Sequence, residues 1–191
     1  MKWFNKGFTG LVLLFLYIPL IVLAVASFNT GTSVSSFQGF TLEQYGELFR
    51  DGTLLPLLAN SLIVAVLSSL CATVLGVTAA IGINSMKRRS RNLVMAATNI
   101  PVINPDLVTG VSLMMIFAFL TVPPGYTTLL LAHITFNIPY VILSVLPKLR
   151  QTSNALYEAA LDLGASPTYA LRKVILPQIM PGIVSGAILA F

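Results

Sequence analysis

One carboxylate, that of Asp106, lies within a long apolar run, where the residues around it suggest cation binding. Counted from Asn92, Asp106 lies about 21 Å along a helix that rises about 1.5 Å per residue, near the middle of a bilayer. Pro101 and Pro105 cannot donate a backbone N–H, so we expect the helix to break or kink at this point. A carboxylate at membrane depth is costly unless it faces a cavity or a partner.

Freed carbonyl groups at membrane depth are tolerated along water-filled paths, and broken helices at the midplane hold the substrates of transporters. We therefore predict that Asp106, with the adjacent Asn104, forms a cation-binding point on a pathway. The alternative is that Asp106 only bonds a neighbouring helix.

A second polar group follows in the next apolar run, where His133, Asn137 and Ser144 share one helical face with Tyr140 near its edge. Such a stripe can line a pore, or it can hold two helices together by hydrogen bonds. We predict that Asn137 and Tyr140 belong to the pathway. For His133 we favour helix packing, because the chain offers no second ligand for a metal, and we predict no metal site.

Residues 149–177 form a polar stretch between two apolar runs, and their pattern predicts two short helices joined by a turn. The first helix, over residues 154–163, carries a narrow stripe of leucine and alanine side chains. Gly164 suits the end of this helix. Ser166 and Pro167 suit the cap and the first position of the next helix.

We expect the second helix to end with Arg172 and Lys173, and Pro177 to stop it before the next apolar run. Alanines make the apolar face of the first helix small and shallow, so it would fit a groove on another protein. A polar hairpin held at the membrane surface therefore indicates a partner protein on that side.

The composition places these groups in a membrane protein. Of the 191 residues, 56% are hydrophobic and 9% are charged, whereas soluble domains carry roughly 25% charged residues. The net charge of +5 comes from short clusters between apolar runs, so it does not indicate nucleic-acid binding. The single cysteine, Cys71, excludes an internal disulfide.

The apolar runs predict an all-α, polytopic helical bundle, since a bilayer core of ~30 Å needs ~20 helical residues. Four runs are long enough to cross, and a fifth would rise only about 21 Å before the last residue. We read the first run as an uncleaved span; the alternative is a cleavable signal peptide. The predicted runs are residues 8–28, 57–84, 93–121 and 127–146, with the partial fifth at 178–191.

The positive charges predict the orientation. Ten of the eleven basic residues fall in three regions that an even alternation of spans places on one side. The positive-inside rule puts these regions, including the N-terminus and residues 149–177, in the cytoplasm. The membrane is then the cytoplasmic membrane, with lipid around the spans.

The opposite side would hold the loop of residues 29–56, with one basic residue, Arg50. Thr41 and Gln44 have the spacing of a capping box, which predicts a short helix on the outer surface. This helix either packs against the spans, which we favour, or docks a protein outside.

Small residues at spacings of three or four mark one face of the second run, and they let another helix approach closely. We assign this face to packing. Its members are Ser61, Ala65, Ser68, Ala72, Gly76 and Ala80.

Enzyme classes find no support in the sequence. The chain has no phosphate-binding Gly-x-x-x-x-Gly-Lys-Ser/Thr loop and no His-Glu-x-x-His or serine–histidine–acid set. We therefore predict a transport subunit without a cofactor of its own. A passive channel would suit the kinked, polar run, although it would not need the cytoplasmic hairpin.

The order Glu158-Ala159-Ala160, Gly164 and Val174-Ile175-Leu176-Pro177 resembles the signature of inner-membrane permease subunits of binding-protein-dependent ABC importers. Val174 in place of isoleucine is the one departure. The resemblance implies a type I importer fold, with this hairpin docking into a separate ATP-hydrolysing subunit. The residues it assigns to coupling are Glu158, Ala159, Ala160, Gly164 and Pro177.

Within that family the whole chain is most similar to the spermidine/putrescine permeases of the C type, through segments such as 16–19, 27–29, 39–41, 105–106 and 133–136. The resemblance implies polyamine uptake driven by ATP, with a second permease subunit and an external polyamine-binding protein as partners. Uptake of another small solute is the alternative. Such permeases have six spans, so we expect this single permease domain, residues 1–191, to be incomplete at its C-terminus.

Overall fold

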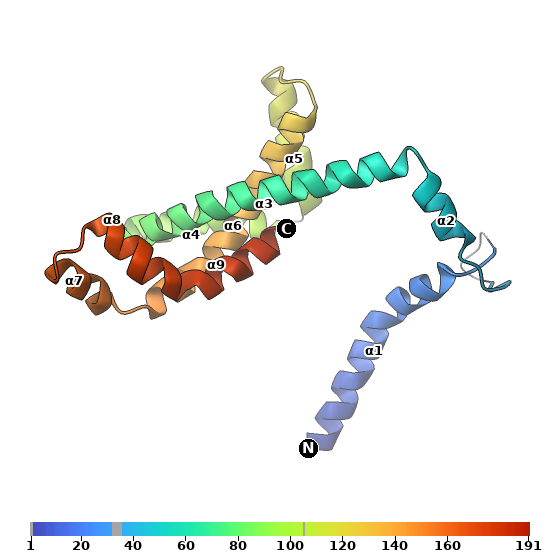
Figure 1. Ribbon diagram of the computed structural model, residues 1–191, viewed down its shortest axis with the longest axis horizontal. Helices are drawn as coiled ribbons and strands as arrows, with labels where there is room; N and C mark the ends of the chain where they lie inside the picture. Colours follow the sequence, from blue (N-terminus) through green and yellow to red (C-terminus); the bar gives the residue numbers. More distant parts are fainter. Residues whose placement is uncertain (1, 32–35, 105) are drawn as a thin grey trace. The chain divides into compact units, whose positions relative to one another are not determined.

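The computed structural model describes residues 2–31, 36–104 and 106–191, and this part of the chain is helical apart from turns and one isolated bridge. It divides into two compact units, residues 1–59 and 60–191, each described by itself below. The elements are α1 (Lys2–Ala26), α2 (Glu43–Arg50), α3 (Leu54–Ser85), α4 (Arg88–Ile103), α5 (Asp106–Phe119), α6 (Tyr126–Gln151), α7 (Asn154–Asp162), α8 (Pro167–Ala170), the π-helical turn η1 (Leu171–Ile175) and α9 (Leu176–Ala190) (Figure 1).

Four helical segments of the described chain are long and apolar enough to cross a membrane. Three of them confirm the first, second and fourth predicted runs, with ends that differ from the predicted ones by one to five residues. The all-α polytopic prediction is thereby confirmed. The segments are Lys6–Ala26, Leu54–Ser85, Tyr126–Gln151 and Pro167–Ala190.

The third predicted run, residues 93–121, is not one helix. It is a pair, α4 and α5, bent by 106°. Asn104, which ends α4, has φ −75° and ψ 143°, the extended conformation that a following proline imposes. The break was predicted, and the bend is much larger than that of a kinked but continuous helix. Pro105 itself lies outside the described residues. Asp106 is the first residue of α5, and its depth in the membrane stays a prediction.

The prediction that Pro177 ends the second hairpin helix is wrong. The chain from Pro167 to Ala190 is one continuous helical segment, in which Pro177 occupies the first turn of α9. Proline has no N–H to donate to the carbonyl four residues earlier. The turn before it is π-helical, and the N–H of Leu176 bonds the carbonyl of Leu171. The wider turn keeps the helix continuous, so the helix that contains the fifth run begins well before residue 178.

The loop after α1, in the unit of residues 1–59, is organised by Asn29, which is only 2% exposed. Its side chain accepts a hydrogen bond from the Gln38 N–H at 2.7 Å and donates one to the Ser36 carbonyl at 2.7 Å. Phe28 stacks on Phe40, with ring centroids 5.3 Å apart. These contacts fold the loop back on itself.

The short helix predicted after this loop is confirmed as α2, but the capping box is wrong. The helix begins after Leu42, with no side-chain cap. The Thr41 hydroxyl accepts from the Glu43 N–H at 3.1 Å. The Gln44 amide instead donates to the Asn29 carbonyl at 2.6 Å, because the loop brings that carbonyl within reach.

Helix α6 is the centre of residues 60–191, where it packs along α9 and also contacts α3, α4 and α5. Close approach depends on glycine. A Cβ built on Gly76 of α3 would lie 2.6 Å from Val141 Cβ, and one on Gly186 of α9 would lie 3.1 Å from Val141 Cα. The small face predicted for the second run is therefore confirmed as a packing face, with Ser68, Ala72, Gly76 and Ala80 buried.

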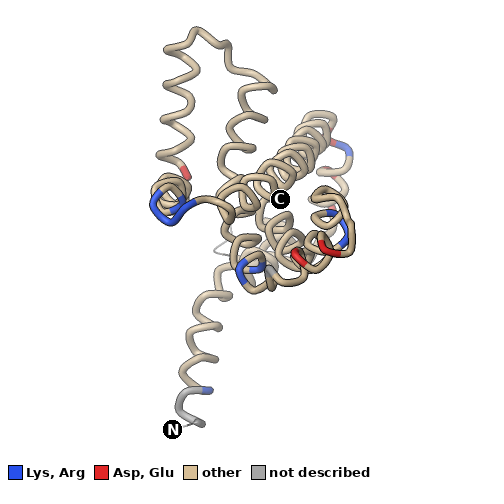
Figure 2. The backbone as a smooth tube through the Cα atoms, turned by 90° about the vertical axis from the view of Figure 1, so that its left-hand side faces the viewer, with Lys and Arg blue, Asp and Glu red and all other residues tan. Residues whose placement is uncertain are grey.

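Basic residues gather in short groups at helix ends (Figure 2). One group, Lys87 to Arg91, follows the end of α3, and another, Lys148 and Arg150, lies in the last turn of α6. The ends of α3 and α6 line one cavity with α7 and α8. These two groups and the hairpin therefore share one end of this unit, as the charge pattern predicted. The cytoplasmic N-terminus stays a prediction.

Candidate functional site

The first leg of the polar hairpin is α7, and local side chains set both of its ends. The Ser153 hydroxyl accepts from the Ala155 N–H at 3.3 Å and caps the start. At the end, Gly164 has φ +86°, the left-handed conformation that glycine adopts without steric cost. The Ala165 N–H then bonds the Ala160 carbonyl at 3.0 Å. This is the helix end that the glycine predicted.

The second leg starts as its sequence predicted. The Ser166 hydroxyl accepts from the Tyr169 N–H at 3.3 Å, and Pro167 takes the first position, where its missing N–H costs no hydrogen bond. Only three residues, 164–166, lie between Leu163 and Pro167. A turn this short holds α7 and α8 in a defined arrangement.

The outer face of the hairpin is exposed and partly apolar. Leu163, at the end of α7, is 89% exposed. Glu158 and Ala159 are exposed, and Ala160 is half-buried. A shallow hollow at the turn is lined by Ala160, Leu163, Gly164, Ala165, Ser166 and Tyr169. An exposed leucine beside a hollow and a carboxylate gives a surface suited to another protein.

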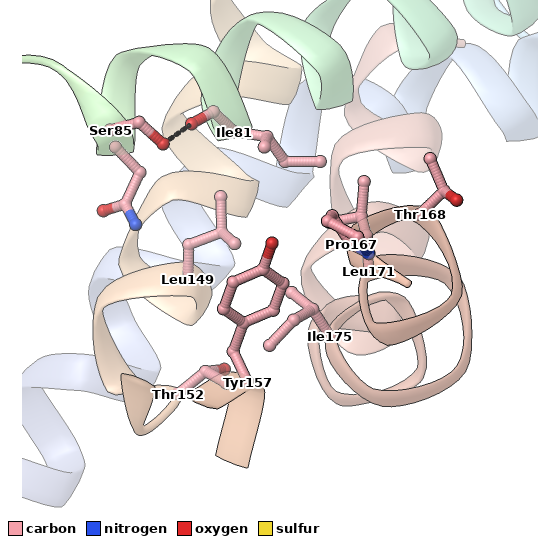
Figure 3. Close-up of a pocket in the computed structure, with 10 residues that line it drawn as sticks. Ile81, Ser85, Leu149, Thr152, Tyr157, Pro167, Thr168, Leu171 and Ile175 are labelled. Carbon is pink, nitrogen blue, oxygen red and sulfur yellow. Dashed lines mark hydrogen bonds between the residues drawn. The ribbon is translucent and has the colours of Figure 1, made fainter. Parts of the chain in front are cut away.

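The hairpin also borders a cavity of about 350 Å³ on its inner side (Figure 3). The walls come from the ends of α3 and α6, from α7, and from α8 with η1. Tyr157 of α7 lies between Leu149 and Ile175 in this view, with its hydroxyl directed toward the open space. The remaining polar lining consists of Asn84, Ser85, Thr152 and Thr168.

A second cavity, of about 400 Å³, lies between α3, α6 and α9, within the candidate spans. Asn137 is its best-held polar group, since its amide donates to the Ala190 carbonyl at 2.6 Å and reaches Ser68 Oγ at 3.4 Å. His133 also lines the cavity, and its Nδ1 lies 2.8 Å from the Leu129 carbonyl oxygen. Asn137 therefore has both roles: it bonds the neighbouring helices, and it lines the cavity.

The structure does not bring the four predicted pathway residues together. Asn137 lines the cavity just described, whereas half-buried Tyr140 does not. Asn104 and Asp106 lie at the break between α4 and α5, and both are exposed. The Asp106 carboxylate makes no ion pair or hydrogen bond with any residue in the described part of the chain. Their place on a pathway stays a prediction.

Three residues that line the two cavities were not predicted to do so. Ser61 and Ser68 were assigned to packing, yet both line the cavity with Asn137; their spacing of seven, two helical turns, was the available signal. The inward position of Tyr157 was not predicted, because a single aromatic residue next to Glu158 forms no spacing pattern that would indicate it. Only the folded hairpin shows that it turns inward.

A polytopic helical bundle with an exposed hairpin on one end is the architecture of a membrane-embedded transport subunit. Residues 72–191 match the model of the family described as binding-protein-dependent transport system inner membrane component. The match includes the hairpin and both of its neighbouring spans. The chain belongs to this family and is a multi-pass membrane protein.

Three curated relatives are similar over nearly the whole chain. The spermidine/putrescine transport system permease protein PotC of Escherichia coli K12 is 37% identical over 185 residues, 97% of this chain and 70% of the relative. PotC of Haemophilus influenzae is 36% identical, over 98% of this chain and 73% of its own length. The putrescine transport system permease protein PotI of Escherichia coli K12 is 36% identical, over 97% of this chain and 66% of its own.

Proposed function

We propose that this chain is a permease subunit that carries polyamines, spermidine or putrescine, across the cytoplasmic membrane into the cell. The observation that carries the proposal is 37% identity over 97% of the chain to a spermidine/putrescine permease. The similarity extends through the spans, which form the path, as well as through the hairpin. An exposed carboxylate at a helix break, that of Asp106, suits a polycationic substrate.

The proposal assigns ATP hydrolysis to a separate subunit. The exposed face of α7, with Glu158, Ala159 and Leu163, would dock into that subunit and receive its movement. A second permease subunit would complete the path, and an external binding protein would deliver the polyamine. ATP binding would close the ATPase pair. The spans would then alternate between an outward-open and an inward-open state, because each ligand binds one of these two states of the transporter more tightly.

One observation favours a second substrate class, an uncharged small solute. The polar side chains that line the membrane cavity are serines, an asparagine and a histidine, with no carboxylate among the described lining residues. Such groups recognise hydroxyl or amide groups as readily as amines. A passive channel has less support, because it needs no docking hairpin.

Uptake by the assembled transporter tests the proposal. The permease pair, its ATPase and its binding protein would be placed in liposomes with radiolabelled spermidine or putrescine. We expect uptake that requires ATP and that an excess of either unlabelled polyamine suppresses. Uptake of a labelled sugar or amino acid, with none of polyamines, would establish the second class instead. Uptake without ATP would indicate a channel.

The docking role of the hairpin is tested separately by Gly164→Leu and Glu158→Lys. A leucine at φ +86° is strained by about 1–2 kcal/mol, and the lysine reverses the charge of the exposed face. We expect both variants to lower transport per ATP hydrolysed in the assembled transporter. Unchanged coupling and unchanged ATPase binding in both would remove the docking assignment.

A further inference from the structure

Tyr157 is the described residue of α7 that reaches the interior of residues 60–191. It packs against the larger core cluster, which is built from α3, α6, η1 and α9 and includes Val77, Val145 and Ile179. Its neighbours on either side in the sequence, Leu156 and Glu158, are exposed. Among the described side chains of α7, the Tyr157 ring is therefore the one that packs against this core cluster.

The surroundings of this ring combine firm contact with free space. Leu149 and Ile175, both buried, lie on either side of it (Figure 3). Beyond the ring is the cavity of about 350 Å³. This cavity is partly open to the outside rather than an enclosed void, and it leaves the ring room to move.

The opposite leg of the hairpin has a different connection to the bundle. Helix α8 continues through η1 into α9 without interruption, so α9 follows the hairpin as a continuous helix. Helix α6 leads into the other leg, α7, through Thr152 and Ser153, whereas α3 is not directly joined to either leg. The ends of α3 and α6 face the hairpin around the cavity, and the Tyr157 ring packs there against the core cluster to which both helices contribute.

We propose that Tyr157 is a positioning residue for transport: its ring carries the movement of α7 to α3 and α6, and the adjoining cavity is the space into which it moves. This inference rests on the proposed function, because it assumes that a partner drives the hairpin. The ring acts by packing. Its hydroxyl makes no hydrogen bond with the described residues, so phenylalanine should serve as well as tyrosine.

Tyr157→Ala and Tyr157→Phe would be compared in the assembled transporter in liposomes. We expect the alanine variant to lose about fivefold or more in spermidine carried per ATP hydrolysed. ATP hydrolysis and co-purification of the ATPase should stay near wild type, and the phenylalanine variant should couple normally. Tyr126→Ala, at the opposite end of α6, is the matched control and should also couple normally. Normal coupling in Tyr157→Ala would overturn the inference.

A second measurement leaves Tyr157 in place, in case the alanine variant does not assemble. Ser85→Cys at the end of α3 and Thr168→Cys on α8 both line the cavity, and Cys71→Ser removes the native thiol. We expect the yield of a bifunctional thiol cross-linker to differ between nucleotide-free and ATP-bound transporter, and the linked protein to stop transport. Equal yields together with undiminished transport would overturn the inference. If the unmodified transporter carries no polyamine at all, the proposed function fails instead.

Discussion

Asp106 has two physical explanations that one substitution separates. As the first residue of α5, its carboxylate is stabilised by the partial positive charge of the helix N-terminus. A helix-end role would tolerate asparagine, because losing the charge there costs only about 0.3–1 kcal/mol of helix stability. A cation-binding role would not, because the charge is lost.

We expect Asp106→Asn to lower polyamine uptake by about tenfold, the loss of one hydrogen bond to a charged group. Assembly with the partner subunits should be unchanged. Radiolabelled uptake and co-purification measure the two properties. Leu107→Ala, at the next position of the same helix start, is the local control for damage to this turn. Normal uptake by Asp106→Asn would leave Asp106 with its helix-end role alone.

Asp51 caps the start of α3 with its carboxylate. Its Oδ1 accepts from the Thr53 N–H at 2.7 Å and from the Leu54 N–H at 3.2 Å. The backbone hydrogen bonds from Thr53 and Leu54 lower the pKa of Asp51 below its usual 3.8. A lowered pKa in the folded state means that the cap stabilises α3 above pH 3.8 and is lost as pH falls through the lower value.

We expect an NMR titration of Asp51 in detergent micelles to show a midpoint below 3.8. The amides of Thr53 and Leu54 should exchange faster with solvent once the carboxyl is protonated. Asp51→Asn should remove this pH dependence while keeping an acceptor for the cap. A midpoint at or above the usual value would contradict the assignment.

At the scale of elements, the packing of α3 on α6 depends on the missing side chain of Gly76. The atom nearest to an added Cβ is Val141 Cβ, at 2.6 Å. A Cβ position is set by the backbone, so no change of rotamer relieves the contact. The two helices would have to separate.

We therefore expect Gly76→Ala to destabilise the protein by about 1–3 kcal/mol, the usual cost of overpacking. Thermal unfolding in detergent measures it. Gly82→Ala is the matched control, because it lies on the same helix with nothing within 4 Å of the added Cβ. It should be neutral or stabilising by up to about 1 kcal/mol, through helix propensity. Equal effects of the two substitutions would show that the close contact is not maintained.

At the scale of the whole molecule, the charge pattern makes a definite prediction of topology. The hairpin and the basic groups at one end of residues 60–191 should face the cytoplasm, and the α5–α6 turn should face outward. The N-terminus should lie on the cytoplasmic side as well. The one cysteine, Cys71, is exposed and can be replaced by serine to leave a background without thiols.

Single cysteines in this background report the topology. In intact cells, we expect a membrane-impermeant maleimide to label the Gly125→Cys variant. The Lys6→Cys and Ser166→Cys variants should be labelled only after the membrane is permeabilised. Labelling of Ser166→Cys in intact cells would place the hairpin outside and contradict its docking to an ATPase. Labelling of Lys6→Cys alone would contradict the predicted position of the N-terminus.

The sequence alone determined the features that depend on neighbouring residues. Composition and run length identify a membrane protein, and Gly164, Ser166 and Pro167 define the hairpin, since caps and turns are set within a few residues. The family signature in the same stretch follows from those residues.

Only the tertiary structure decided what depends on distant residues. Asn137 bonds the Ala190 carbonyl, 53 positions away, and Tyr157 reaches a core whose members come from four other elements. The 106° break and the π turn that carries α8 into α9 also needed the fold. Prolines signal where a helix is interrupted, but packing against neighbours sets whether the chain turns sharply or continues.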